Sequence, residues 1–157
     1  MNCDRFRFAR QGGLDRASLG PFGVQVEQGG RHGTFKGVAR ITGIAVNDYG
    51  LSPEDLIFDT LTFPLTTGQE ELRNDAIETI EGIRRIRAEL PGGFTSLGVS
   101  NVSCGLSPRT RAVLNSVFLH HCVEAGLDLA MVNPNHIKPY NEIAENERDL
   151  TDDLVFT

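Results

Sequence analysis

Each of three strand-like runs in this chain is followed by one residue with a short carboxylate or carboxamide side chain. The runs and the polar residues after them are 56–58 with Asp59, 97–100 with Asn101, and 129–132 with Asn133. Nearly continuous apolar runs that recur between helical segments are typical of buried parallel strands. Because parallel strands direct their carboxyl ends to one edge of a sheet, we expect the three polar residues to converge on a ligand site there.

Two amphipathic helices are predicted between these strands. Apolar residues spaced by one, three and four positions indicate the first helix, which begins near residues 67–69 and ends before Pro91. The second has clear start signals, since Ser107 can cap it and Pro108 suits its first position. Gly126 marks its end, and the third strand follows directly.

The segment before the first strand is less regular. Residues 1–37 hold eight of the chain's 17 glycines and show no sustained period of 2 or 3.6. We therefore expect these residues to be irregular and poorly ordered, or a non-native leader. From Val38 a helical face begins, with Gly50 at its C-terminal end. The tail from Pro139 onward is acidic and has weak helical periodicity.

These elements predict an α/β fold of about three βα units, which is part of a TIM-type (β/α)8 barrel. A complete barrel needs eight strands and typically ~250 residues. This chain has 157 residues, enough for one domain with its own core. We assign residues 38–157 to the partial barrel and residues 1–37 to the irregular N-terminal segment. The chain is thus expected to be a piece of a larger fold.

The charge balance excludes some classes of partner. With 15 basic and 21 acidic residues the net charge is −6, so there is no basic field to attract nucleic acid. No apolar stretch approaches the ~20 residues that span a bilayer, and the N-terminus lacks the apolar core of a signal peptide. We expect a cytoplasmic protein that contacts neither nucleic acid nor membrane.

The cysteines and a histidine pair are interpreted as packing residues. Cys3, Cys104 and Cys122 are odd in number and their spacing matches no zinc motif, so we expect this chain to bind no metal ion. His120 and His121 lie within the second predicted helix. Neighbouring helical residues point about 100° apart, so the two rings are expected to pack separately rather than share a ligand.

The residues at the strand ends are the candidates for binding. The carboxylate of Asp59 can accept two adjacent N–H donors at once, although the same residue could equally cap its loop. Gly98 lets a ring or another backbone approach closely. Ser100 and Asn101 offer donors and acceptors to a heteroaromatic edge, or alternatively satisfy the backbone of a turn.

Three segments resemble the pterin-binding barrel of cobalamin-dependent methionine synthases. They read EDLIFDTLTFPLTTG, LGVSNVSCGLSP and VLNSVFLHHCVEAGLDLAMVN, and the resemblance runs from about Asn47 to the C-terminus. It implies that Asp59 receives the amino-pyrimidine edge of a pterin and that Asn101 forms a hydrogen bond near N5. It also implies that Gly98 and Ser100 line the same pocket.

The resemblance further implies a reaction, in which the N5-methyl group of 5-methyltetrahydrofolate passes to cob(I)alamin and then to homocysteine. Asn101 would be the catalytic residue, because a hydrogen bond at N5 favours the protonated form in the transition state. The earlier barrel strands and the modules that bind cobalamin and homocysteine have no counterpart in this chain. They would be its partners within a complete enzyme.

Two other functions fit the same sequence. One is another pterin-barrel enzyme, either a corrinoid methyltransferase or a dihydropteroate synthase. The synthase needs a basic residue for its leaving pyrophosphate near the last strand end, and Lys138 is the candidate there. The other is a catalytically inert binding fragment that keeps only part of the site. Whether this chain acts alone as an enzyme is left open by its sequence.

Overall fold

The computed structural model describes residues 30–66, 68 and 72–156. The helices and strands in chain order are α1 (Gly30–Gly43), β1 (Ile57–Asp59), α2 (Asp75–Glu89), β2 (Phe94–Leu97), α3 (Pro108–Glu124), β3 (Leu129–Ala130) and α4 (Glu145–Phe156). Shorter helical turns lie between them, at η1 (Ile44–Asp48), η2 (Pro53–Asp55), η4 (Val99–Ser103), η5 (Pro134–His136) and η6 (Tyr140–Glu142). In this part of the chain none of the helices is long and apolar enough to cross a membrane.

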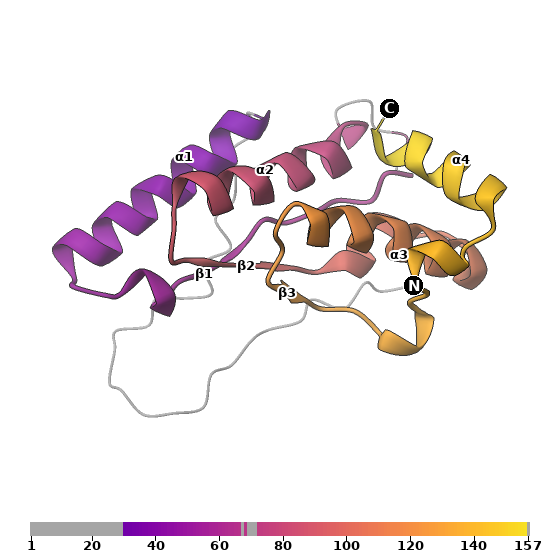
Figure 1. Ribbon diagram of the computed structural model, residues 1–157. Helices are drawn as coiled ribbons and strands as arrows, with labels where there is room; N and C mark the ends of the chain where they lie inside the picture. Colours follow the sequence, from indigo (N-terminus) through magenta and orange to yellow (C-terminus); the bar gives the residue numbers. More distant parts are fainter. Residues whose placement is uncertain (1–29, 67, 69–71, 157) are drawn as a thin grey trace.

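The strands form one parallel sheet in the order β1-β2-β3 (Figure 1). Ile57 lies opposite Phe94 in the pairing of β1 with β2, and Ser96 lies opposite Leu129 in the pairing of β2 with β3. Each strand is joined to the next through one long helix, α2 or α3. The predicted α/β fold and the predicted parallel arrangement of the strands are therefore confirmed.

In the described part of the chain, helices cover one face of this sheet, and apolar side chains on the other face are exposed. Side chains alternate between the two faces of a strand, and Phe58, Thr95 and Leu97 are buried on the face that carries the helices. The opposite face presents Ile57, Phe94 and Leu129, whose exposed fractions are 57%, 38% and 48%. A chain that was complete in itself would cover such an apolar sheet face, so this exposure agrees with the prediction of a partial barrel.

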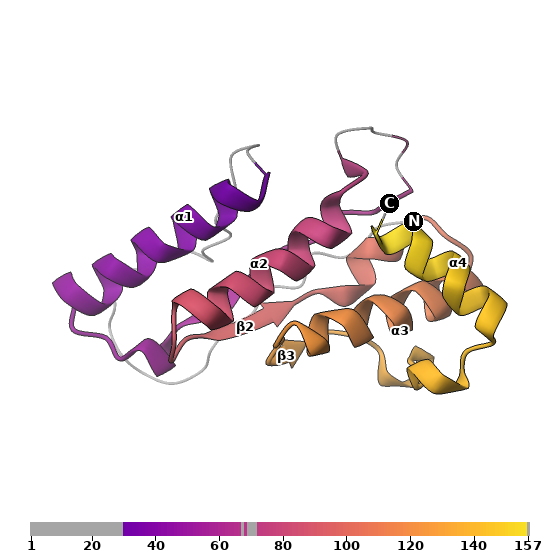
Figure 2. The same cartoon turned by 45° about the horizontal axis from the view of Figure 1, so that its top comes forward.

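The core lies between the sheet and the helices. Its larger part contains buried apolar side chains from α2, β2, η4, α3 and α4, among them Ile80, Leu97, Val102, Phe118 and Val155. Through Val155 the acidic C-terminal segment is packed onto α2 and α3, and Figure 2 shows α4 beside α3. A smaller cluster joins α1, β1 and α2 through Val38, Phe58 and Ile86.

The N-terminal helix crosses the predicted boundary between residues 37 and 38. α1 begins at Gly30, and Phe35 packs against the smaller core cluster with the guanidinium of Arg85 4.0 Å from its ring centre. These contacts with α2 are remote in sequence, which explains why local periodicity did not reveal them. The rest of the predicted irregular segment, residues 1–29, lies outside the described residues. Gly50, with φ at 66°, ends the helical segment as predicted.

Among the later elements, the predicted boundaries hold for α3 and differ for α2 and β2. α3 spans Pro108–Glu124 as expected, with the Ser107 hydroxyl accepting the N–H of Thr110. α2 begins at Asp75 and not near residues 67–69, of which only residue 68 lies within the described part. β2 ends at Leu97, so Ser100 and Asn101 lie in the 3-10 turn η4 beyond the strand rather than on it.

Candidate functional site

The carboxyl ends of the three strands carry the predicted polar residues, but these residues have different roles. Asp59 is the last residue of β1, and Asn101 lies in the turn after β2. Asn133 caps η5, where its side-chain oxygen accepts the N–H of Asn135 at 3.1 Å. The candidate site is therefore built from Asp59 and Asn101, and the third strand end is occupied by a local cap.

One oxygen of the Asp59 carboxylate already has a partner. Its Oδ1 atom accepts the N–H of Leu61 at 2.9 Å, which is the loop-capping role that the sequence left open. The Oδ2 atom makes no hydrogen bond to any of the described residues. Partial burial of the carboxyl group raises the pKa of Asp59, and the hydrogen bond from Leu61 only partly opposes that rise. One oxygen thus remains available to a ligand at the end of β1.

The loop after Asp59 is held by the start of α2. The Oδ2 atom of Asp75 accepts the N–H of Phe63 at 2.6 Å and the hydroxyl of Thr62 at 3.1 Å. The hydroxyl of Thr79, one turn further along α2, donates to the carbonyl of Leu61 at 2.9 Å. Sequence reasoning missed both residues of α2, because it placed Asp75 inside a longer helix.

The turn η4 places Asn101 next to Gly98. The backbone N–H of Asn101 donates to the carbonyl of Gly98 at 3.1 Å. A Cβ atom at position 98 would lie 3.1 Å from Nδ2, the side-chain amide nitrogen of Asn101. The missing side chain of Gly98 therefore makes room for the Asn101 amide. Sequence analysis had expected it to make room for a ligand ring or for another backbone.

An arginine from α3 fixes this turn. The Nη2 atom of Arg111 donates to the carbonyl of Ser100 at 3.2 Å, and its Nε atom donates to the hydroxyl of Ser103 at the same distance. That hydroxyl also donates to the Ser100 carbonyl. Ser100 therefore contributes its backbone to the turn. The sequence did not identify Arg111, because its place in the helical pattern does not indicate that its side chain contacts η4.

A shallow, mostly apolar hollow of about 240 Å³ lies beside Asn101. Its walls are Leu61, Thr62, Phe63, Pro64, Asn101 and Cys104. Asp59, Gly98 and Ser100 are not among the lining residues, although Asp59 is bonded to Leu61 in the wall. The structure thus brings Asn101 together with the loop that Asp59 anchors. The backbone N–H of Leu65 joins this loop to η4 by donating to the Val102 carbonyl at 3.1 Å.

Comparison with known proteins covers the same part of the chain. The family described as pterin binding enzyme matches residues 30–133. The methionine synthase of Mycobacterium tuberculosis is 45% identical over 137 residues, which are 85% of this chain and 12% of that protein. The methionine synthase of Mycobacterium leprae is 43% identical over 137 residues, again 85% of this chain and 11% of the relative. These matches confirm the resemblance found in the sequence, and they show that the chain spans about an eighth of its relatives' length or less.

Proposed function

Because the chain belongs to the pterin binding enzyme family, we propose that it forms part of the folate-binding barrel of a cobalamin-dependent methyltransferase that makes methionine. One observation carries the proposal. Asn101 and the loop anchored by Asp59 border a single hollow at the carboxyl ends of two neighbouring parallel strands. In barrels of this type, ligand sites lie at that end of the sheet.

Asp59 is the proposed partner of the pterin's amino-pyrimidine edge. Its free Oδ2 oxygen can accept one N–H from that edge. Its Oδ1 oxygen already accepts the N–H of Leu61 and can accept a second N–H from the pterin as well. The carboxyl group is partly withdrawn from water, so its charged form gains more from new donors than a fully solvated carboxylate would. Asp59 therefore contributes chiefly to binding.

Asn101 is the proposed catalytic residue. Its amide borders the hollow and is positioned by Gly98 and by the Arg111 contacts to η4. As the methyl group leaves N5 of 5-methyltetrahydrofolate, the C–N bonding pair stays on nitrogen and a proton must be supplied there. A carboxamide at N5 stabilises the protonated nitrogen in the transition state more than in the ground state, which is the condition for raising the rate. When bound, cob(I)alamin supplies the nucleophile that accepts the methyl group.

The remaining parts of the enzyme are proposed partners of this chain. The relatives are several times longer, and the exposed side chains of Ile57, Phe94 and Leu129 form a face that the other strands of the barrel would cover. The modules for cobalamin and homocysteine would also lie outside this chain. We place the whole enzyme in the cytoplasm. The isolated chain is expected to bind folate weakly or not measurably.

A chimera tests the proposal. Residues 30–156 of this chain replace the matching segment of the Mycobacterium tuberculosis methionine synthase, and folate affinity and single-turnover methyl transfer are measured. The chimera is expected to bind 5-methyltetrahydrofolate and to methylate cob(I)alamin. Asn101→Ala should lower the transfer rate much more than the affinity, because its contact strengthens as N5 is protonated.

The controls separate function from folding. Asp48→Ala removes an exposed carboxylate outside the site and should leave both measurements unchanged. Circular dichroism and thermal unfolding establish that each chimera is folded. A folded chimera that binds folate but transfers no methyl group would favour the inert binding fragment. One that is folded and binds no folate contradicts the proposal.

A further inference from the structure

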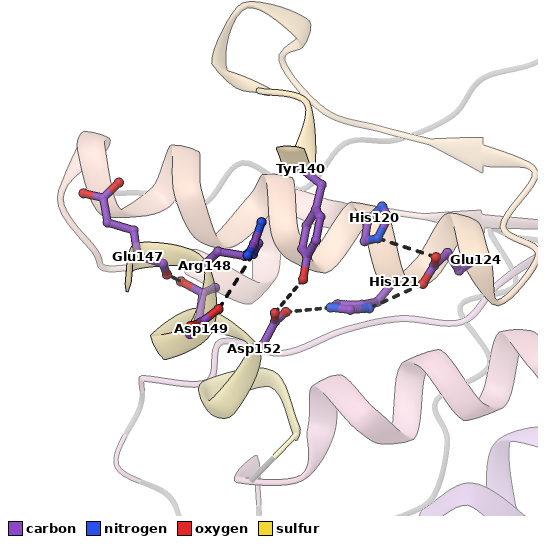
Figure 3. A network of polar contacts seen from close by, with 9 residues as sticks. His120, His121, Glu124, Tyr140, Glu147, Arg148, Asp149 and Asp152 are labelled. Atoms are coloured by element: carbon purple, nitrogen blue, oxygen red, sulfur yellow. Dashed lines mark hydrogen bonds and ion pairs between the residues drawn. The ribbon is translucent and has the colours of Figure 1, made fainter. Parts of the chain in front are cut away.

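Two histidines and a glutamate gather near the C-terminal end of α3 (Figure 3). The Nε2 atom of His120 lies 3.6 Å from Oε1 of Glu124, and the Nδ1 atom of His121 lies 3.8 Å from Oε2 of the same carboxylate. The ligand atoms of all three residues lie within 4.8 Å of one another. Arg111, which holds η4, lies nine positions earlier, or about 13 Å along the helix axis. The cluster is therefore separate from the proposed folate site.

The position of Glu124 explains how two neighbouring histidines share a partner. Although the two rings point in different directions, Glu124 follows them by four and by three residues, so its carboxylate reaches both rings. The rings are partly buried, with side-chain exposures of 34% for His120 and 16% for His121, whereas Glu124 is 62% exposed. The two imidazole rings are thus restrained by the residues around them, whereas the exposed side chain of Glu124 can change its rotamer.

Residues from the C-terminal segment orient both rings. His120 is stacked on Tyr140 with ring centres 4.0 Å apart and an angle of 16° between the planes. Nε2 of His121 lies 2.7 Å from Oδ1 of Asp152, and the Tyr140 hydroxyl donates to Oδ2 of the same residue at 2.6 Å. Figure 3 shows Asp152 between the tyrosine and the imidazole. When Asp152 accepts the N–H of Nε2, Nδ1 is the ring nitrogen of His121 that can bind a metal ion.

We propose that His120, His121 and Glu124 bind one divalent transition-metal ion of the zinc type, with Asp152 as a positioning residue. The ligand atoms are Nε2 of His120, Nδ1 of His121 and an oxygen of Glu124. A carboxylate that accepts the second N–H of a metal-binding histidine is the usual outer-shell arrangement at such sites. Two imidazole nitrogens and one carboxylate oxygen suit zinc, cobalt, nickel and copper, whereas magnesium and calcium prefer oxygen ligands alone.

The candidate ligand atoms lie within 4.8 Å of one another, a wider spread than a bound ion requires, so the side chains must move closer together. Ligand atoms ~2.0–2.1 Å from a tetrahedral zinc ion lie about 3.3 Å from each other. The distances of 3.6 Å and 3.8 Å run from the two rings to different oxygens of Glu124, so this exposed side chain has to rotate to bring one oxygen to both rings. Three protein ligands leave a fourth position for water, as in open zinc sites. The expectation that this chain binds no metal rested on cysteine spacing and on the angle between neighbouring helical residues, and neither argument took Glu124 into account.

Metal titration of the full 157-residue chain tests the site. After treatment with a chelator, the chain is titrated with zinc sulfate by calorimetry, and with magnesium chloride as the comparison. We expect zinc to bind at one site that depends on Glu124, and magnesium to show no binding there. Glu124→Gln and His120→Phe should each weaken zinc binding at least tenfold, and the phenyl ring keeps the stacking contact with Tyr140. Asp152→Ala should weaken it about 10–100-fold, the range for outer-shell partners.

Two further measurements make the result decisive. Glu142→Gln removes one exposed carboxylate from the same end of the chain, and zinc affinity should stay within twofold of the wild type. Cobalt(II) bound at this site should show the stronger visible absorption of four- or five-coordinate cobalt, and Glu124→Gln should abolish it. Thermal unfolding checks that the variants are folded, and Asp152→Asn replaces Asp152→Ala if the alanine variant is not. Equal zinc affinity in the wild type and in Glu124→Gln overturns the proposal, as does a wild type that binds no zinc.

Discussion

The carboxylate of Asp75 accepts the backbone N–H of Phe63 at 2.6 Å, so the first turn of α2 holds the loop that borders the candidate folate site. The two residues are 12 positions apart. The contact sets the path of the chain between β1 and α2, and therefore the shape of the wall opposite Asn101. Substitution of Asp75 should therefore lower the free energy of unfolding even when no ligand is bound.

Replacing Asp75 by alanine should lower the free energy of unfolding by about 1–3 kcal/mol, since the N–H of Phe63 and the hydroxyl of Thr62 lose their acceptor. Asp75→Asn keeps a side-chain oxygen and should cost less. Urea unfolding of the two variants and the wild type in the chimera measures the difference. Equal losses for alanine and asparagine would show that the acceptor is unimportant.

Stability should also depend on pH through Asp75. Burial raises the pKa of this carboxyl group, the hydrogen bonds from Phe63 and Thr62 lower it in part, and the charge of Glu78 adds to the rise. The folded chain therefore holds this proton more tightly than the unfolded chain, whose group titrates near 3.8. Stability rises as the pH falls through the folded pKa and is lost again as the pH increases. The wild type should gain stability relative to Asp75→Asn between neutral pH and pH 4, measured by urea unfolding at each pH.

In the chimera, Asp59→Ala should weaken binding of 5-methyltetrahydrofolate by on the order of 2–3 kcal/mol, the range for a lost hydrogen bond to a charged group. The expected reason is that the pyrimidine donors lose their acceptor at the end of β1. Equilibrium binding to the chimera and to its Asp48→Ala control provides the comparison. Unchanged folate affinity in Asp59→Ala would mean that the pocket has been placed wrongly.

Gly98→Ala should slow methyl transfer without unfolding the protein. Gly98 has φ at −79°, a value that alanine adopts without strain, so the substitution is compatible with the backbone. The added Cβ would lie 3.1 Å from the amide nitrogen of Asn101 and would push that amide by a few tenths of an ångström. The measurements are single-turnover transfer and thermal unfolding of the chimera. A variant with normal rate and normal stability would show that the position of Asn101 is not critical.

Cys122 should resist alkylation in the folded chain. Burial raises the pKa of its thiol to about 12, and only the thiolate reacts with iodoacetamide. Mass spectrometry of the peptide that contains Cys122 should therefore show little labelling at pH 8 in buffer and complete labelling in denaturant. Rapid labelling in buffer would place this residue outside the core that Phe118 and Val155 form around it.

The sequence was sufficient where the signals are local. The three strands were indicated by apolar runs separated by helices, and the start of α3 was indicated by Ser107 and Pro108. The resemblance to the pterin-binding barrel was also carried by short continuous segments, and the family match confirms it. Such features depend on neighbouring residues, so the linear pattern contains the information needed to predict them.

Features that depend on contacts between distant residues were missed. The start of α2 is set where Asp75 binds a loop 12 residues earlier, and α1 extends back to Gly30 because Phe35 packs against α2. The histidine pair is similar, since Asp152 lies 31 positions after His121 and its approach depends on how α4 packs. Asn101 was placed at the strand end, although β2 stops at Leu97 and the chain turns.

Leu61 is the one described residue other than glycine with a positive φ, 55°, in the left-handed region. That conformation costs a residue with a side chain about 1–2 kcal/mol, and here Asp59 accepts its N–H while Thr79 donates to its carbonyl. The wall of the hollow is thus fixed in an uncommon shape by the folded chain itself. A ligand that meets a preorganised wall does not have to order it, so the entropy cost of that loop falls on folding rather than on binding.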